Sequence, residues 1–243
     1  MTLTAAALPG LPEVRPGDDL AALLATAADR IGGLRAGDVL AVAHKVVSKA
    51  DGRVVALAEV EPRAEARALA AAHGKDPRHV QVILDESAEV LRADRGRLIC
   101  RTRHGFVCAN AGVDASNAGG PDRLVLLPTD PDASARALHA ALGAAVVITD
   151  SFGRAHRQGQ AEVAIGAAGI TALDDRRGLP DGDGRPLAAT QIAIADQAAA
   201  AADLVRGKAT REPAVRLRGL ERYVADGPGA AVLVRAPEED LFT

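Results

Sequence analysis

The stretch GDVLAVAHKVVSKADGR, residues 37–53, decides the fold, because an apolar run in it gives way abruptly to basic and polar side chains. Its first part predicts a buried strand, after which we expect a polar crest and a turn. A second apolar run, AAVVITD at residues 144–150, predicts another buried strand that stops at Asp150. In α/β proteins, polar groups at the ends of such strands mark the place where a site forms.

Helical and strand-like segments alternate around these two runs. Helices are predicted over residues 59–73, ending near Gly74, over residues 80–90 and over residues 134–142. Strand-like pieces are predicted at residues 97–103, 105–112 and 124–128. The first two of these pieces are joined by a turn at His104 and Gly105.

The second half of the chain is richer in glycine. SFGRAHRQGQAEVAIGAAGI, residues 151–170, is predicted to be a loop that leads into a segment packed through Ala and Gly. Residues 179–187 predict a turn or hairpin tip. Further along, the pattern predicts a strand that becomes an Ala-rich helix within residues 187–205, closed by Gly207, and a final central strand at 213–220. We therefore expect a mixed α/β (α+β) body, a single domain over residues 1–243.

The composition excludes several classes of function. Lys and Arg total 29 against 32 for Asp and Glu, so the chain has no global positive charge to hold nucleic acid or an anionic membrane. Cys100 and Cys108 lie eight positions apart with no His or Cys at metal-ligand spacing, so neither a zinc site nor a disulfide framework is expected. With no signal-peptide pattern and no apolar run of roughly 20 residues, we expect a cytoplasmic protein without a membrane partner.

A cluster of basic and polar side chains follows the first strand directly. It contains His44, Lys45, Ser48, Lys49 and Arg53. Two lysines and an arginine near one turn can neutralise phosphate charge, and Ser48 adds a hydroxyl group. The alternative is a solvated crest that merely carries basic side chains.

A second cluster, rich in oxygen atoms, lies in the segment CANAGVDASN. Its polar members are Asn110, Asp114, Ser116 and Asn117. Hard cations such as Mg²⁺ or Mn²⁺ prefer carboxylate, amide and hydroxyl oxygens. The alternative is a network of Asx turns that satisfies only its own backbone.

A third cluster, Asp150 and Ser151, ends the second buried strand. An Asp at a strand end followed by a hydroxyl residue resembles the metal sites of nucleotide enzymes, although strand ends also carry capping Asp residues. Because a divalent ion that bridges phosphates uses one or two carboxylates, Asp114 and Asp150 together favour a metal site.

A fourth cluster, Arg154, His156, Arg157 and Gln160, comes immediately afterwards. Guanidinium groups recognise phosphate and carboxylate. Basic groups beside an acidic metal site are expected if both surround a polyanion. His156 is a candidate base, and its alternative is a hydrogen-bonded structural residue.

Three familiar motifs are absent. Without a GxxxxGK[ST] loop the chain is not a P-loop nucleotidase, and without GxGxxG after the first strand it lacks the simplest dinucleotide site. No GxSxG nucleophile elbow occurs, and Cys108 lies in an apolar strand where a core position is expected.

An ordered set of segments gives the chain a resemblance to a known family. The segments are residues 10–20 (GLPEVRPGDDL), 37–53, 111–117 (AGVDASN), 126–135 (LLPTDPDASA), 146–169 and 202–215 (ADLVRGKATREPAV). They span Gly10 to Gly219 and resemble the coenzyme F420-0:L-glutamate ligase (F420 gamma-glutamyl ligase) family. The chain looks closer to the ligase half of the bacterial two-domain members. Since it stops at Thr243, we expect no C-terminal reductase-like domain.

The resemblance implies an activity, a fold and partners. It implies a GTP-dependent ligase that joins the carboxylate of F420-0 to the amine of L-glutamate through an acyl phosphate, with possible further γ-linked glutamates. It also implies a two-lobed α/β fold particular to the family, neither Rossmann nor P-loop. A homodimer, Mg²⁺ or Mn²⁺, and activation by K⁺ are implied as well.

The resemblance also implies roles for particular residues. Asp114, Asp150 and Ser151 match metal-binding positions. Nucleotide contacts match Gly10, Leu11, Pro12, Glu13, His44, Lys45, Lys49 and Asn117. As a mechanistic hypothesis, Lys49, Arg154 and Arg157 stabilise the transferring phosphoryl group and His156 acts as the base.

Two departures from the family pattern stand out. Archaeal members place a Glu, taken to bind a second metal, where this chain has Lys208 in Arg206-Gly207-Lys208. His44 and Lys45 replace small hydroxyl residues expected beside the nucleotide. Two rival functions therefore stay open: a metal-dependent nucleotide phosphohydrolase, and a GTP-binding module without turnover.

Overall fold

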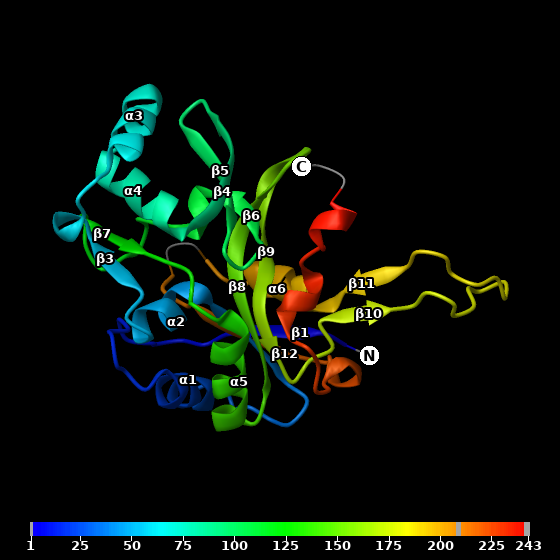
Figure 1. The fold of residues 1–243 in the computed structure, drawn as a ribbon. Helices are drawn as coiled ribbons and strands as arrows, with labels where there is room; N and C mark the ends of the chain where they lie inside the picture. Colours follow the sequence, from blue (N-terminus) through cyan, green and yellow to red (C-terminus); the bar gives the residue numbers. More distant parts are fainter. Residues whose placement is uncertain (1, 208–209, 241–243) are drawn as a thin grey trace.

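A five-stranded sheet lies at the centre of the computed structural model, which describes residues 2–207 and 210–240 (Figure 1). The strand order is β1 (Thr4–Ala7), β12 (Ala214–Arg218), β2 (Val39–Ala43), β8 (Ala145–Arg154) and β9 (Arg157–Ala168). β2 and β8 run parallel, and every other neighbouring pair is antiparallel. The mixed α/β class predicted from the sequence is confirmed.

The sheet is buried on both faces, which explains its continuous apolar strands. Leu40 and Val42 pack with α1 (Leu20–Asp29) and α5 (Pro131–Leu142). Val39 and Ala41 face the other way and pack with α6 (Ile194–Asp203). Alternate side chains of a strand point to opposite faces, so a strand covered twice must be apolar throughout.

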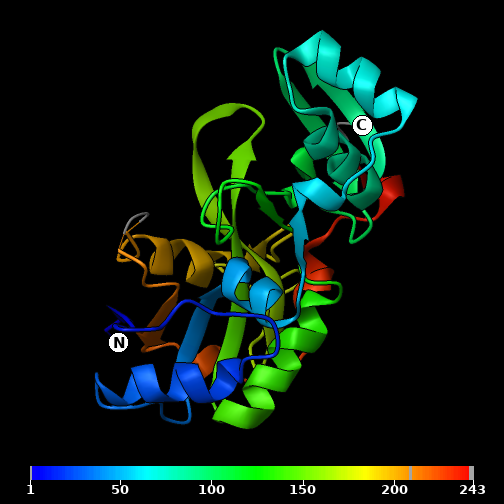
Figure 2. The ribbon, with the colours of Figure 1, turned by 90° about the vertical axis from the view of Figure 1, so that its left-hand side faces the viewer.

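A second, smaller lobe stands beside this body (Figure 2). It contains α3 (Ala64–His73), α4 (Pro77–Glu86) and the antiparallel strands β4 (Ser87–Asp94), β5 (Arg97–Thr102) and β6 (Val107–Ala109). Its core is separate and includes Ile83 and Leu98. The pair β3 (Val54–Ala56) and β7 (Arg123–Val125) joins it to the body. The chain thus has the two lobes expected from the resemblance.

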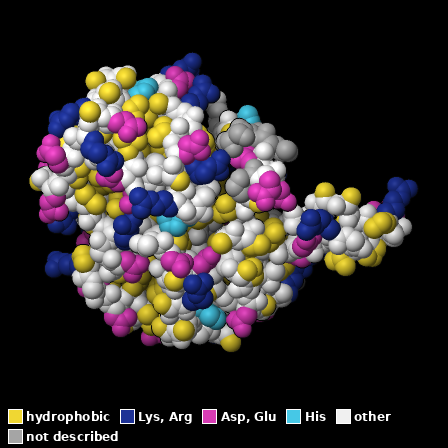
Figure 3. Space-filling model, in the orientation of Figure 1, with side chains coloured by type: hydrophobic (Ala, Val, Ile, Leu, Met, Phe, Trp, Pro, Cys, Tyr) yellow, Lys and Arg dark blue, Asp and Glu magenta, His cyan; other side chains and the backbone are white. Residues whose placement is uncertain are grey.

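A long arm projects from the body, as Figures 1 and 3 show. Its base is formed by β10 (Leu173–Asp175) and β11 (Gln191–Ala193). Residues 179–187 form its far end, where Pro180 and Pro186 pair, so the predicted hairpin tip is confirmed. Leu179 on this arm is half exposed.

Three predicted elements need correction. The crest after β2 is a short helix, α2 (His44–Ala50). The predicted helix 59–73 begins only at Ala64, although it ends with Gly74 in a left-handed conformation as expected. The predicted helix 80–90 is shifted: α4 starts at Pro77, a residue suited to a first helical turn, and strand β4 takes over at Ser87.

The largest correction concerns residues 151–170, which are not a loop. β8 continues beyond Asp150 to Arg154, turns, and returns as β9. One of the glycines that suggest a loop, Gly166, permits a close approach instead. A Cβ atom at Gly166 would lie only 2.4 Å from the carbonyl oxygen of Pro131, at the start of α5. Glycine within a strand often marks such an approach.

The structure bears on two classes of protein weighed from the sequence, membrane-spanning proteins and enzymes with a cysteine nucleophile. None of the described helices is long and apolar enough to cross a bilayer. Cys100 and Cys108 are both buried and free, on neighbouring strands of the small lobe, as expected for core residues. Burial raises the pKa of the Cys108 thiol to about 12, which makes it a poor nucleophile.

Gly166→Ala should lower the free energy of unfolding by about 1–3 kcal/mol, because the new methyl group must push β9 away from α5. Thermal and urea unfolding measure the change. Gly182→Ala is the matched control, since a Cβ atom there meets nothing within 4 Å. Equal stability of the two variants would show that β9 does not pack against α5 in this way.

Candidate active site

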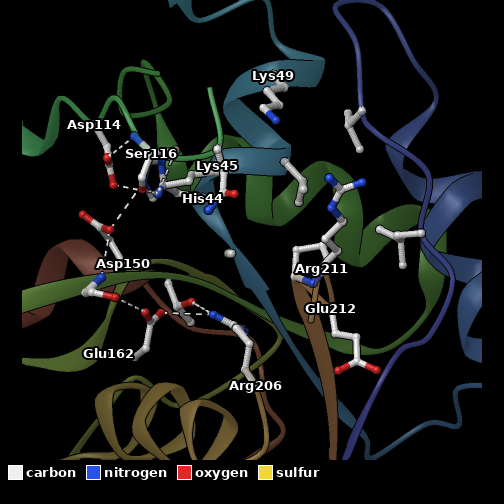
Figure 4. Close-up of a pocket in the computed structure, with 18 of the residues that line it drawn as sticks. His44, Lys45, Lys49, Asp114, Ser116, Asp150, Glu162, Arg206, Arg211 and Glu212 are labelled. Atoms are coloured by element: carbon white, nitrogen blue, oxygen red, sulfur yellow. Dashed lines mark hydrogen bonds and ion pairs between the residues drawn. The ribbon is translucent and has the colours of Figure 1, made fainter. Parts of the chain in front are cut away.

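The parallel pairing of β2 and β8 places their carboxyl ends side by side. Ala43 is the register partner of Thr149, so the next residues along each strand, His44 and Asp150, are neighbours. His44 Nε2 lies 3.3 Å from Asp150 Oδ1. A cavity of about 970 Å³ opens at this edge of the sheet (Figure 4). Such a position is where α/β sheets bind ligands.

The cavity brings together segments that lie far apart in the sequence. Its walls are residues 11–14, helix α2, the loop after β6, the β8–β9 hairpin and residues 203–213. Of the residues singled out from the sequence, twelve line it: Leu11, Pro12, Glu13, His44, Lys45, Lys49, Asp114, Ser116, Asn117, Asp150, Ser151 and Gln160. Three of the four polar clusters therefore meet here, and the fourth contributes Gln160 alone.

The other predicted residues lie outside the lining. Ser48 is buried and its hydroxyl lies 3.3 Å from His44 Nδ1. Arg53 pairs with Glu86 at 2.6 Å. Beyond these, the lining lacks Gly10, Asn110, Arg154, His156 and Arg157. The last three occupy the exposed turn of the β8–β9 hairpin, where the Arg154 guanidinium donates to the backbone carbonyl of Gln158 at 2.6 Å.

Helix α2 directs two lysines at carboxylates on opposite walls. Lys45 Nζ lies 2.6 Å from Asp114 Oδ2 and 2.7 Å from the Ser116 hydroxyl oxygen. Lys49, almost fully buried, forms an ion pair with Glu13. Each pair joins α2 to a separate segment of the chain, so a bound polyanion would meet two preplaced cations.

Asp114 is held by its backbone as well as by Lys45. Its amide and carbonyl groups both bond to Val125 of the body-linking pair β3–β7, at 3.0 and 2.8 Å. Its side chain accepts a hydrogen bond from the Ser116 amide, which is the Asx turn weighed as an alternative. Asp114 therefore forms an Asx turn and lines the cavity at the same time. Burial alone would raise the pKa of Asp114, but the bonds from Lys45 and Ser116 hold it below its ordinary value.

The sequence reasoning missed a largely buried pair in the cavity wall, Glu162 of β9 and Arg206 after α6. Arg206 Nη1 lies 3.1 Å from Glu162 Oε2, and their side chains are 9% and 6% exposed. Alternation along a strand was the signal that could have found Glu162. It was overlooked because residues 151–170 were interpreted as a loop. Burial lowers the pKa of Arg206, against the attraction of Glu162.

The charge balance of the cavity bears on metal binding. Its described lining holds six carboxylates and four Lys and Arg side chains: Glu13, Asp114, Asp150, Glu162, Asp203 and Glu212 against Lys45, Lys49, Arg206 and Arg211. A nucleoside triphosphate would therefore need added positive charge.

The donor atoms suit a hard cation that also binds phosphate. Among the described residues, no three His, Cys, Asp or Glu side chains gather to hold a metal by themselves. Mg²⁺ typically takes one or two carboxylates and completes its shell with substrate phosphates and water. Asp114, Asp150 and the Ser151 hydroxyl fit that pattern.

Comparison with known proteins places the chain in a family. The sequence profile described as F420-0:Gamma-glutamyl ligase matches residues 10–219. The chain belongs to this family. The coenzyme F420:L-glutamate ligase of Methanopyrus kandleri is 48% identical over 242 residues, covering 95% of this chain and 93% of that protein. The protein of the same name from Methanothermobacter thermautotrophicus is 44% identical over 243 residues, covering 96% of each.

Family membership makes the chain an enzyme of the ligase class and confirms the resemblance seen in its motifs. The matched range contains the whole cavity lining, from Leu11 to Pro213. Of the two departures noted in the sequence, His44 and Lys45 both line the cavity. Lys208 lies outside the described residues, whereas Arg206, two positions earlier, is the buried partner of Glu162.

Lys45→Met should raise the pKa of Asp114, because burial persists while the opposing charge is lost. Carboxyl ¹³C NMR titration, with Asp114→Asn to assign the signal, measures the shift. Arg67→Met, which removes an exposed pair with Glu61, is the control and should leave the signal unmoved. An unchanged pKa in Lys45→Met would contradict the ion pair.

Proposed function

We propose that this chain joins the carboxylate of F420-0 to the amine of L-glutamate, using GTP, in the biosynthesis of coenzyme F420. The observation that carries the proposal is a single cavity, inside the range matched by the family, where two lysines and two aspartates from three segments converge. The names of the relatives supply the acceptor and the amino acid. The use of GTP and the acyl phosphate intermediate rest on the resemblance seen in the sequence.

The nucleotide would enter with its phosphates between α2 and the β8–β9 hairpin. Lys45 and Lys49 are already oriented into this space by Asp114 and Glu13. Phosphate oxygens compete for these ammonium groups, so binding exchanges internal ion pairs for bonds to the ligand. The lining segment Leu11–Glu13 and Asn117 supply further contacts.

Asp114, Asp150 and Ser151 would hold Mg²⁺ or Mn²⁺. When bound, this ion supplies positive charge that neutralises the phosphates and their developing negative charge. Lys49, buried and fixed, provides a second preorganised charge at little reorganisation cost.

The proposed reaction has two steps. The substrate carboxylate oxygen attacks the γ-phosphorus of GTP, the bond to the β-phosphate oxygen breaks, and GDP leaves. The free amine of glutamate then attacks the acyl carbon, the carbon–oxygen bond to phosphate breaks, and a proton leaves the nitrogen. Alignment and electrostatics account for most of such catalysis, so the two steps need no covalent intermediate on the protein.

The hairpin turn suits the acceptor better than the phosphoryl group. Residues 153–160 are exposed and contain Arg154 and Arg157 but no Asp or Glu. Because these arginines lie outside the cavity lining, we propose that they bind anionic groups of F420-0 that trail out of the cavity, and that His156 lies beside them rather than acting as a base.

Assembly as a homodimer, and activation by K⁺, complete the proposal. The projecting arm, with its half-exposed Leu179, offers a contact surface for a second copy (Figure 3). Size-exclusion chromatography with light scattering measures the assembly. Replacement of K⁺ by Na⁺ in the ligation reaction measures the activation.

Asp150→Asn should reduce ligation at least about a thousandfold while the thermal unfolding curve stays close to that of the unaltered chain. The assay is mass spectrometry of F420-0 after incubation with GTP, Mn²⁺ and L-glutamate, where each addition adds one glutamyl unit. Asp183→Asn, on the exposed arm, is the control. The same assay of the unaltered chain distinguishes the rival functions. Phosphate release from GTP that does not depend on glutamate would favour the phosphohydrolase, and GTP binding without turnover would favour the binding module.

Arg154→Met with Arg157→Met should raise the KM for F420-0 about tenfold or more and leave the KM for GTP unchanged, because the double variant removes only two contacts, both of them to F420-0. Arg92→Met, an exposed arginine of β4, is the control. A fall in kcat with both KM values constant would instead return these arginines to the phosphoryl transfer.

A further inference from the structure

The Glu162–Arg206 pair in the cavity wall is fixed from several sides. Arg206 donates to the Thr149 hydroxyl oxygen at 2.9 Å and to the carbonyl oxygen of Ala41 at 3.4 Å, besides Glu162 at 3.1 Å. These partners come from β8, β2 and β9, so the guanidinium is anchored to three adjacent strands of the sheet. Arginine keeps its charge in proteins, and a buried charge requires a counter-charge.

The second oxygen of Glu162 reaches the cavity wall. The Ser151 hydroxyl donates to Glu162 Oε1 at 2.5 Å, across the register pair that joins β8 and β9. A carboxylate paired with a guanidinium is an acceptor only, so the proton of this bond must come from Ser151. A serine hydroxyl has a single proton to give.

The donation fixes what Ser151 can offer to a ligand. With its proton committed to Glu162, the Ser151 oxygen presents lone pairs alone, which attract a cation and repel phosphate oxygens. The Ser151 amide also donates to Asp150 Oδ1 at 2.8 Å, which fixes the orientation of the Asp150 carboxylate. Neither the sequence pattern nor the family comparison assigns a role to Glu162 or Arg206.

We propose that Glu162, held by Arg206, is a positioning residue that turns the Ser151 hydroxyl into an acceptor-only oxygen for a divalent cation beside Asp150. The proposal rests on the proposed function only in taking that cation to be the one that accompanies the nucleotide. Partners that orient metal ligands in this way typically contribute about 10–100-fold to metal affinity.

A mutant cycle on Mn²⁺ binding tests the positioning role without any turnover. The dissociation constant of Mn²⁺ alone is measured by electron paramagnetic resonance for the unaltered chain, Glu162→Gln, Ser151→Ala and the double variant. As a single substitution, Glu162→Gln should weaken Mn²⁺ binding about 10–100-fold. In the Ser151→Ala background the same change should weaken it less than about twofold, since the group that Glu162 orients is gone.

Glu162→Gln leaves the buried charge of Arg206 without its partner, which lowers the free energy of unfolding, so a second variant is needed. Glu162→Leu with Arg206→Met removes both charges and the acceptor of the Ser151 proton, and replacement of a buried ion pair by apolar side chains is often tolerated. This variant should show the same loss of Mn²⁺ affinity and the same insensitivity in the Ser151→Ala background. Circular dichroism confirms the fold of each variant.

Three results would overturn the proposal. They are unaltered Mn²⁺ affinity in a folded Glu162 variant, an equal loss with and without Ser151, and no Mn²⁺ binding by the unaltered chain at millimolar concentration. The cycle is separable from the proposed function. Coupling between Glu162 and Ser151 without glutamate ligation would keep the positioning role and reject the substrate assignment.

Discussion

The parallel register of β2 and β8 is the constraint on which the rest of the site depends. Because Ala43 pairs with Thr149, His44 at the start of α2 meets Asp150 within the hairpin, and the cavity opens between them. The apolar residues that set this register are buried on both faces of the sheet by α1, α5 and α6. A shift of one residue would move the side chains of one strand to the opposite face of the sheet, disrupt the packing of both apolar layers and displace His44 from Asp150.

Electrostatic pairing then prepares the cavity for a polyanion. Lys45 and Lys49 leave the same short helix toward Asp114 and Glu13, so each cation is held in place by a group that can release it. Arg206 is different, because its ion pair with Glu162 is largely buried within the cavity wall. The site thus combines exchangeable ion pairs that face the ligand with a fixed pair that orients the residues around it.

Much of this was predictable from residue order alone. The apolar runs ending at Ala43 and Asp150 predicted the strands, and polar clusters after them predicted most of the lining. The β8–β9 hairpin was not predictable in this way, because Gly153, Gly159 and Gly166 carry a loop signal that the pairing of the two strands overrides. At Gly166 the glycine instead permits close packing on α5. The burial of Glu162 was not predictable either, because it depends on strand β9. The distance between Asp114 and the β8 edge depends on tertiary pairing with β7, which no local pattern encodes.

Transfer of oxygen from the acceptor tests the central claim most directly. F420-0 labelled with ¹⁸O in its carboxylate is incubated with the chain, GTP, Mn²⁺ and L-glutamate, and the inorganic phosphate is analysed by mass spectrometry. The account predicts one ¹⁸O atom in each phosphate released with amide formation, because the carboxylate oxygen leaves with the γ-phosphoryl group. Unlabelled phosphate accompanying the glutamylated product would contradict activation of the carboxylate in this cavity.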